Sequence, residues 1–233
     1  MVMTPALTDP VHSPLEPRLQ RAGATMVVRH GWWVAAHYGS PAGELALCDT
    51  AVGLADRSDL GKFELRGESG AVEQLVGQLT GGRVSSGESL LAADAWWCSV
   101  SDAHVVALCD AGNTAALRTA LQDAARWAPG ATVVDSTLRL AAIGLLGPAT
   151  GALLDDISGS EPPLGEVSAP AFDVTMLAAV PVMLLRASDS RAVILTEARR
   201  AGELWADLER AGQAHGLGHV GADAVSHDSP LSR

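Results

Sequence analysis

The sequence has 233 residues, of which 48% are hydrophobic and 18% are charged, and its formal net charge is −11. An acidic chain without a basic patch is a poor binder of nucleic acid, because contacts to phosphates dominate that affinity. No apolar run approaches the roughly 20 residues of a membrane-spanning helix, and the N-terminus lacks the basic and apolar regions of a secretory signal. The three cysteines are odd in number and lack metal-ligand spacing, which favours reduced thiols in the core of a cytoplasmic protein.

The two ends of the chain show the weakest periodicity. Residues 1–21 are rich in proline, so we expect a flexible N-terminal arm, and residues 22–28 carry a weak signal for a strand or a helical turn. The segment from Gly212 onward is rich in Gly and His and is expected to be loose, with residues 225–233 as a tail.

Residues 30–67 concentrate aromatic side chains, although aromatics make up only 4% of the sequence. Trp32, Trp33, His37 and Tyr38 could line a flat pocket that binds a planar heterocycle by stacking. Equally, alternate members of this group could pack the core beneath a loop.

A helix over residues 44–52 and a half-buried strand over residues 62–67 follow, the latter because Phe63 and Leu65 alternate with polar residues. Between them lies a polar segment, residues 56–59, with the sequence Asp-Arg-Ser-Asp. This segment could hold a ligand, but internal pairing of Arg57 with Asp59 and capping of a turn by Ser58 is the favoured interpretation.

The remaining elements alternate hairpins with helices. The apolar periodicities predict helices over residues 71–79, 113–127, 147–157 and 197–211, strands over residues 95–100, 104–109, 131–134, 138–146, 172–176, 180–186 and 192–195, and an exposed loop over residues 159–169. Strict β-α-β alternation is absent, which indicates an α+β fold with mainly antiparallel sheets. Two halves of similar order, divided near Thr132, indicate duplicated split βαβ, ferredoxin-like units.

Few residues suggest chemistry by themselves, since dinucleotide, phosphate-loop and metalloprotease motifs are absent. Asp94 precedes the pair Trp96–Trp97, and a carboxyl group beside large aromatics can acquire a raised pKa that suits acid–base work. The alternative is an Asp at the end of a loop that accepts backbone hydrogen bonds. His215 and His219 have metal-ligand spacing, but the glycines between them favour a solvated segment over a metal site.

The stretch from His30 resembles the start of the glycine cleavage system T-protein, a tetrahydrofolate-dependent aminomethyltransferase. The resemblance lies in His30-Gly31-Trp32, in residues 37–40 (His-Tyr-Gly-Ser), and in residues 53–62, which fit the pattern G-[LF]-x-D-x-S-x-x-G-K. Residues 145–149 (Leu-Leu-Gly-Pro-Ala) and the late helix add to it. The resemblance covers residues 22–224 and only the family's N-terminal, folate-binding portion, without its C-terminal barrel.

This resemblance implies a folate-binding domain over residues 22–224, with halves at about 22–131 and 132–224, and tetrahydrofolate or a derivative as cofactor. Asp94 would be the catalytic carboxylate. The candidate ligand-binding residues are Trp32, Trp33, His37, Tyr38, Asp56, Arg57, Ser58, Trp96, Asp110 and Arg186.

The sequence departs from the family pattern at several of these places. A hairpin before Asp94 is expected to be missing, Ala93 replaces one member of the family's paired Asp, and Asp110 stands where the family has Asn. The Glu that holds the pterin ring corresponds to Val193, which cannot accept a hydrogen bond. From Asp94 onward the chain is also similar to the gamma subunit of heterotetrameric sarcosine oxidase, a short single-domain relative.

Two hypotheses of different classes follow. In the first, which we favour as a family assignment, the chain is a one-carbon transferase that binds a reduced folate or another flat heterocycle. In the second, it is a non-catalytic, gamma-like subunit that docks on an oxidase or methyltransferase partner. Because the C-terminal domain is missing, an apolar flank is expected, which predicts a homodimer or a complex with a larger enzyme subunit.

Overall fold

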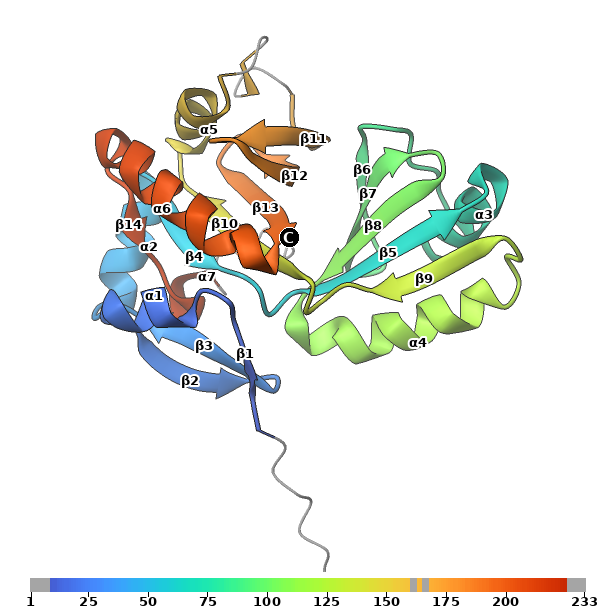
Figure 1. Ribbon diagram of the computed structural model, residues 1–233, viewed down its shortest axis with the longest axis horizontal. Helices are drawn as coiled ribbons and strands as arrows, with labels where there is room; N and C mark the ends of the chain where they lie inside the picture. The colour runs from blue at the N-terminus through green and yellow to red at the C-terminus, as the bar shows by residue number, and fades with distance from the viewer. Residues whose placement is uncertain (1–8, 160–162, 165–167, 226–233) are drawn as a thin grey trace, which may run out of the picture.

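The computed structural model describes residues 9–159, 163–164 and 168–225, and they form two lobes joined at one side (Figure 1). One lobe is built on a five-stranded sheet, here sheet C. The other contains a six-stranded sheet, sheet B, and a three-stranded sheet, sheet A. The strands are mainly antiparallel and all three sheets are open within the described residues, so the predicted α+β class is confirmed.

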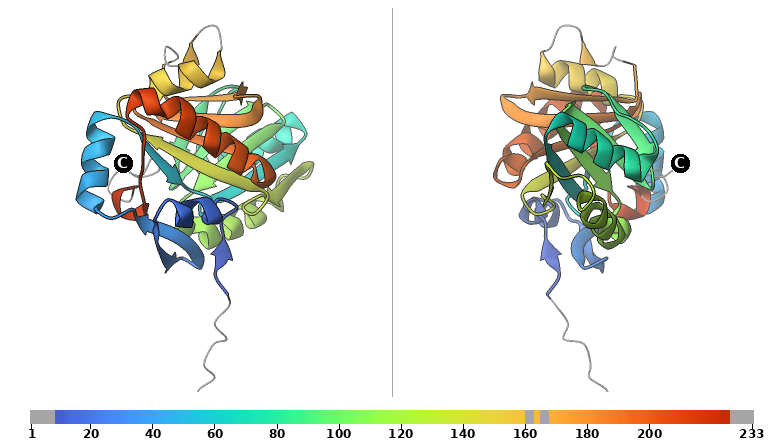
Figure 2. Two further views of the ribbon diagram at one scale, coloured as in Figure 1. Left: turned by 60° about the vertical axis from the view of Figure 1, so that its left-hand side comes forward. Right: turned by 90° about the vertical axis from the view of Figure 1, so that its right-hand side faces the viewer.

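Sheet C has the strand order β6-β7-β8-β5-β9, with every neighbouring pair antiparallel. Its elements are β5 (Gly61–Gly67), α3 (Ser69–Thr80), β6 (Ser89–Ala92), β7 (Ala95–Ser101), β8 (His104–Cys109), the 3-10 turn η1 (Ala111–Asn113), α4 (Thr114–Ala125) and β9 (Ala131–Asp135). Helices α3 and α4 cover its outer face, which the right-hand view of Figure 2 faces. The apolar stripe that predicted each helix is the side packed on this sheet, where Leu75 and Leu121 are fully buried.

Sheet B has the order β11-β12-β13-β10-β4-β14, and only the last pair is parallel. Its elements are β4 (Gly53–Asp56), β10 (Leu140–Leu146), α5 (Thr150–Ser158), β11 (Ala171–Leu177), β12 (Val180–Ser188), β13 (Arg191–Glu197), the 3-10 turns η3 (Ala198–Arg200) and η4 (Gln213–His215), α6 (Ala201–Gly212) and β14 (Gly218–His219). Helices α5 and α6 cover one face. Strand β10 is buried along its whole length, as its continuous apolar run predicts.

Sheet A is formed by β1 (Val11–His12), β2 (Thr25–Arg29) and β3 (Trp32–His37), in the order β1-β3-β2. Around it lie α1 (Glu16–Arg21), α2 (Pro41–Thr50) and α7 (Ala222–Val225). Ser40 caps α2 by accepting a hydrogen bond from Gly43 N at 3.1 Å.

The inner faces of sheets B and C meet in an apolar cluster that we call the seam. It is formed by Leu60, Trp96, Cys98, Val106, Leu108, Ala142, Phe172, Leu185, Val193 and Leu195. The protein is therefore layered as helices, sheet C, sheet B and helices, with the seam as the middle of the sandwich.

Two expectations about the ends of the chain are wrong. Residues 11–21 are not a flexible arm, because β1 pairs with β3 and α1 buries Leu15 and Leu19 completely. The segment after Gly212 is not loose, because β14 pairs with β4 and Gly221 N donates to the buried carboxylate of Glu44 at 2.8 Å. Residues 1–8 and 226–233 of the expected arm and tail lie outside the described residues.

The hairpin expected to be missing before Asp94 is present. Strands β6 and β7 pair antiparallel and are joined by Ala93 and Asp94 alone, with φ values of 50° and 55°. Two successive residues with positive φ make the tight turn that suits a two-residue hairpin. The hairpin is shortened to its minimum rather than lost.

The division into halves near Thr132 stays a prediction. Thr132 lies in β9, which pairs with β5 in sheet C, and the chain returns at β10 to sheet B, to which β4 already belongs. Within the described part of the chain, no helix has the length and apolar character needed to cross a membrane.

Candidate functional site

The polar segment between β4 and β5 is fixed firmly to sheet B. Arg57 N donates to Ala142 O at 2.8 Å, and Ser58 Oγ accepts from Ala142 N at 3.3 Å. Asp56 accepts from Ser58 N at 3.0 Å, which closes a local turn. Burial raises the pKa of the Asp56 carboxyl, and hydrogen bonds from Ser13 and Ser58 partly offset that effect.

Arg57 connects this segment to the end of sheet C. Its Nε lies 3.3 Å from Asp59 Oδ1 and its Nη2 lies 3.0 Å from Asp110 Oδ1. The side chain is only 8% exposed. Its remaining nitrogen, Nη1, is buried and has no hydrogen-bond partner among the described residues.

Lys62 lies behind this cluster and is fully buried. Its Nζ donates to Ser58 O and Leu60 O at 2.8 Å each, and lies 5.9 Å from the centre of the Trp32 ring. Burial lowers the pKa of Lys62 to about 8, although Asp59 and Asp56 act in the opposite direction. The ammonium group therefore holds the polar segment by its carbonyls and faces an aromatic ring.

Two cavities open beside these residues, and His30 lines both. The larger, of about 590 Å³, is lined by Trp32, Thr137 and Leu138 among others, and the smaller, of about 240 Å³, is lined by Arg57 and Asp59. Both share the backbone at Gly112, and a Cβ on Gly112 would lie 3.2 Å from Cε1 of His30. The imidazole of His30 therefore packs on Gly112, where the two cavities share lining residues.

The aromatic residues of the early stretch do not gather around one pocket. Trp32 lines the larger cavity, and the half-buried Trp33 is its neighbour on strand β3, where side chains alternate between faces. Tyr38 instead contacts His219, with ring centroids 5.2 Å apart, and His219 stacks on Trp205 at 5.6 Å.

Hydrogen bonding and charge at these aromatic residues fit a packed environment. Burial raises the pKa of Tyr38, and the carboxylates of Asp56, Glu44 and Glu209 add to this. His37 Nδ1 accepts from Gly39 N at 3.1 Å. His37 and Tyr38 therefore stabilise the start of α2 and the contact with α6.

Three further candidates lie apart from the two cavities. Asp94 is exposed at the β6–β7 turn, and because Ala95 faces Cys109 in the sheet register, Asp94 lies at the same end of sheet C as Asp110. Trp96 is 6% exposed inside the seam. Arg186 is 3% exposed, donates to Leu164 O and lies 3.8 Å from Asp189.

The structure thus brings together Asp56, Arg57, Ser58 and Asp110, with Trp32 nearby, and keeps Tyr38, Trp96 and Arg186 elsewhere. His30 and Asp59 were missing from the predicted ligand-binding residues. The signal that could have found them is the resemblance itself, because both lie within the stretch that carries it.

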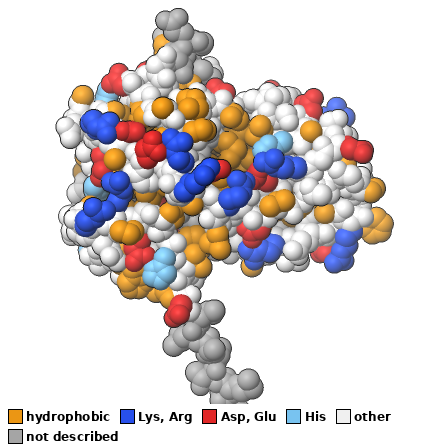
Figure 3. All heavy atoms as spheres, in the orientation of Figure 1, with side chains coloured by type: hydrophobic (Ala, Val, Ile, Leu, Met, Phe, Trp, Pro, Cys, Tyr) orange, Lys and Arg blue, Asp and Glu red, His pale blue; other side chains and the backbone are white. Residues whose placement is uncertain are grey.

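A buried carboxylate on β5 was also missed. Glu64 is 2% exposed at its side chain, accepts from Ser136 Oγ at 2.5 Å and from His104 Nε2 at 3.1 Å, and pairs with Arg66 and Arg139. Burial and the neighbouring Arg66 lower the pKa of His104. Figure 3 shows acidic, basic and His side chains side by side where the lobes meet. The alternation on β5 predicted exposure for Glu64, but the long arginine side chains cover it.

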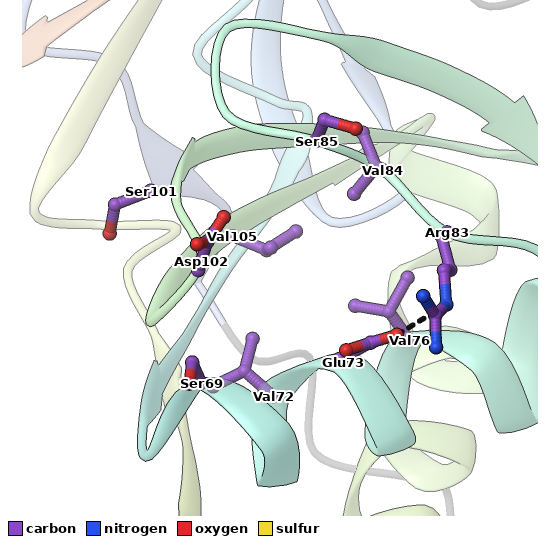
Figure 4. A pocket seen from close by; sticks show the side chains of 10 residues that line it. All are labelled: Ser69, Val72, Glu73, Val76, Arg83, Val84, Ser85, Ser101, Asp102 and Val105. Carbon is purple, nitrogen blue, oxygen red and sulfur yellow. Dashed lines mark ion pairs between the residues drawn. The ribbon is translucent and has the colours of Figure 1, made fainter.

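A third cavity, of about 250 Å³, lies in the sheet C lobe (Figure 4). Val72, Val76 and Val105 form its buried floor. Glu73 and Arg83 form an ion pair at one side, and Asp102 lies across from them. None of the predicted ligand-binding residues lines it.

The described residues contain no group of three or more His, Cys, Asp or Glu side chains that could hold a metal ion. His215 Nε2 lies 2.6 Å from Asp156 Oδ2 and His219 Nε2 lies 2.8 Å from Glu209 Oε1. Each imidazole therefore contacts a carboxylate on a helix.

Among curated proteins, the aminomethyltransferases of Mycobacterium tuberculosis and Mycobacterium bovis are 35% identical to this chain over 127 residues. That match covers 49% of this chain and 34% of each relative, so the chain spans about a third of their length.

Two solved structures share the fold. The glycine cleavage system aminomethyltransferase T from Bartonella henselae has a TM-score of 0.75 at 17% identity, covering 92% of this chain and 60% of that chain. A chain of the heterotetrameric sarcosine oxidase from Corynebacterium sp. U-96 has a TM-score of 0.64 at 20% identity, covering 89% of this chain and 97% of that chain.

The family model of the GCVT N-terminal domain matches residues 15–227. This range takes in sheets B and C, strands β2 and β3 of sheet A, the polar segment at Arg57 and the seam. The chain belongs to the GCVT N-terminal domain family, and its fold is that of the aminomethyltransferases.

Proposed function

We propose that this chain is a binding subunit of a larger enzyme complex and does not itself transfer a one-carbon unit from folate. The observation that carries this proposal is the filled seam between sheets B and C. Val193 and Leu185 are fully buried there, and Trp96 is 6% exposed. A site for a polar ring would need hollow space and acceptors at this place, and the seam has apolar side chains instead.

Tetrahydrofolate is the group that the family resemblance implies, and the residues present do not fit it. Val193 stands at the position that the resemblance assigns to the pterin-holding Glu, and its side chain offers no acceptor for the N–H groups of a pterin. The Trp96 ring packs in the same cluster. A bound pterin would have to displace this packing and leave its own donors unpaired, which costs about 1–3 kcal/mol for each buried group.

The extent of the structural match also supports a subunit role. This chain covers 97% of one chain of a heterotetrameric sarcosine oxidase, but 60% of the Bartonella aminomethyltransferase T. A domain of this size therefore occurs as a whole chain in an assembly. We propose by analogy that the present chain joins a larger partner, in the reducing cytoplasm, where its three buried cysteine thiols would stay reduced.

The other hypothesis keeps Asp94 as an acid–base group acting on a bound folate or another flat heterocycle. Its support is the family and the position of Asp94, which is exposed at the same end of sheet C as Asp110. It requires the ligand to bind outside the seam or the seam to open.

Calorimetry with tetrahydrofolate and 5-methyltetrahydrofolate separates the two hypotheses. We expect no heat of binding from either ligand at millimolar concentration. Binding of either folate, together with loss of turnover in Asp94→Asn at nearly unchanged affinity, would replace the subunit proposal with the enzyme hypothesis.

The partner is tested by purifying the tagged full chain from its native host. We expect a stoichiometric complex with one larger polypeptide, identified by mass spectrometry and sized by light scattering. A chain that purifies alone, as a monomer or homodimer, would contradict the subunit role.

A further inference from the structure

The guanidinium of Arg57 is incompletely paired. Nε and Nη2 reach Asp59 and Asp110, but Nη1 is buried and has no partner among the described residues. Buried polar groups in folded proteins are nearly always hydrogen-bonded, and leaving one unpaired costs about 1–3 kcal/mol. An acceptor from outside the described residues is therefore expected at this nitrogen.

The cavity of about 240 Å³ beside Arg57 has walls of two kinds. One wall is polar and carries the Arg57 guanidinium and the Asp59 carboxylate, whose side chain is 21% exposed. The apolar part of the lining includes Val34, Ala222 and Val225. A ligand that satisfies this cavity must combine an acceptor, a donor and a small aliphatic part.

The remaining charged groups narrow the choice of ligand. Arg29 also lines the cavity and is paired with Asp223, and Asp110 lies beside Arg57. A simple anion would face the carboxylates of Asp59 and Asp110, and a simple cation would leave Arg57 Nη1 unpaired. His30, which lies close to Gly112, lines both this cavity and the larger one.

We propose that this cavity binds a small zwitterionic α-amino acid with a short aliphatic side chain. Its carboxylate accepts hydrogen bonds from Arg57 Nη1, its ammonium group donates to Asp59, and its side chain lies against Val34 and Val225. The site is separate from the seam. It does not depend on the subunit role, since a catalytic or a non-catalytic chain could carry it.

The charged residues of this site either lie outside the fixed positions of the family motif or depart from the family pattern. Positions 57 and 59 are variable in the motif that carries the family resemblance, and Asp110 stands where the family has Asn. In this chain they form the ion-paired group Asp59–Arg57–Asp110.

The proposal is tested by isothermal calorimetry on the full chain with L-alanine, propionate and ethylamine. Propionate is alanine without its ammonium group, and ethylamine is alanine without its carboxylate. We expect L-alanine to bind at least about tenfold more tightly than either half, because each half leaves one charged partner unpaired. Equal affinities for L-alanine, propionate and ethylamine would overturn the proposal. So would the absence of L-alanine binding at roughly 50 mM, which is a 50-fold excess over a millimolar Kd.

Two variants locate the binding. Asp59→Asn, at a partly exposed position, should weaken L-alanine binding about tenfold and leave propionate unchanged or improved. Arg57→Met should abolish the binding of both. If Arg57→Met does not fold, as judged by circular dichroism, Asp59→Asn decides.

Asp102→Asn is the matched control, since Asp102 is an exposed carboxylate on the rim of the cavity in the other lobe. It should leave all three affinities unchanged. The assignment of the site would be overturned if Asp59→Asn bound L-alanine as tightly as the wild type. It would also be overturned if Asp102→Asn lowered the affinity as much as Asp59→Asn does.

Discussion

The seam and the cavity at Arg57 are two regions of one family frame with opposite character. The seam lies between two sheets and is apolar and filled, with Trp96 and Val193 buried. The Arg57 cavity lies where the polar segment meets the end of sheet C, and it is hollow and charged. Backbone architecture is shared with the aminomethyltransferases, so side-chain size and polarity alone decide which region can admit a ligand.

The largest effect that tests this contrast is expected from Val193→Glu, which places in the seam the carboxylate that the family resemblance assigns to this position. We expect the free energy of unfolding to fall by about 3–5 kcal/mol, because an unpaired carboxyl group would be buried among apolar side chains. Urea denaturation measures the loss, and calorimetry checks that no folate binding is gained.

Val174→Glu is the matched control for this change. Val174 lies on the edge strand β11 and is 56% exposed, so the same substitution there should cost about 0.5 kcal/mol or less. A Val193→Glu protein that is as stable as the Val174→Glu protein, and that binds tetrahydrofolate, would show that the seam is an openable pocket.

A second prediction concerns Lys62, whose ammonium group is buried behind the Arg57 cavity. Its pKa in the folded protein is about 8, below the ordinary 10.5, so the unfolded chain binds more protons between these values. Stability contributed by this group therefore rises with pH from about 8 to 10.5, by about 3 kcal/mol at most. Urea titrations of the wild type and Lys62→Met across this range, under reducing conditions, measure the effect as a difference.

Taking the difference is necessary because other buried groups act in the opposite direction. Burial raises the pKa of Cys98, Cys109 and Tyr38, so that stability contributed by each is lost as pH rises above the pKa of the unfolded chain. These groups are present in both proteins and cancel. A stability difference between wild type and Lys62→Met that does not change with pH would mean that Lys62 is solvated.

The sequence predicted most of the regular structure, because that structure follows from local periodicity. Helices α3 and α4 and strands β7, β8 and β10 lie where apolar spacing placed them, and the resemblance on residues 30–67 led to the correct fold. Helix α1 was missed because it has only six residues. Its apolar periodicity consists of two buried residues, Leu15 at the N-cap and Leu19 within the helix. Such a helix is stabilised by tertiary packing rather than by its own propensity.

The site was less predictable because its contacts join segments far apart in the chain. Arg57 meets Asp110 across 53 positions, and Glu64 meets Arg139 across 75. No local pattern reports such pairs. The alternation on β5 indicated which side of the sheet Glu64 faces. It did not indicate that other side chains cover Glu64 there, because a period of two carries no information about what packs on a sheet.

The smallest effect is expected from Asp110→Asn, which restores the residue type that the family has at this position. The Asp110 side chain is 39% exposed, and an Asn can still accept a hydrogen bond from Arg57 Nη2, while Asp59 remains as a charged partner. We therefore expect a loss of about 1 kcal/mol in urea denaturation, as for a partly exposed ion pair.

Asp123→Asn, which breaks the exposed pair with Arg126, is the control and should change stability by less than about 0.5 kcal/mol. A loss of about 3 kcal/mol or more in Asp110→Asn would mean that the Arg57 charge is as poorly solvated as a charge placed in the seam. The two regions would then differ only in shape, and no longer in how well they solvate a charge.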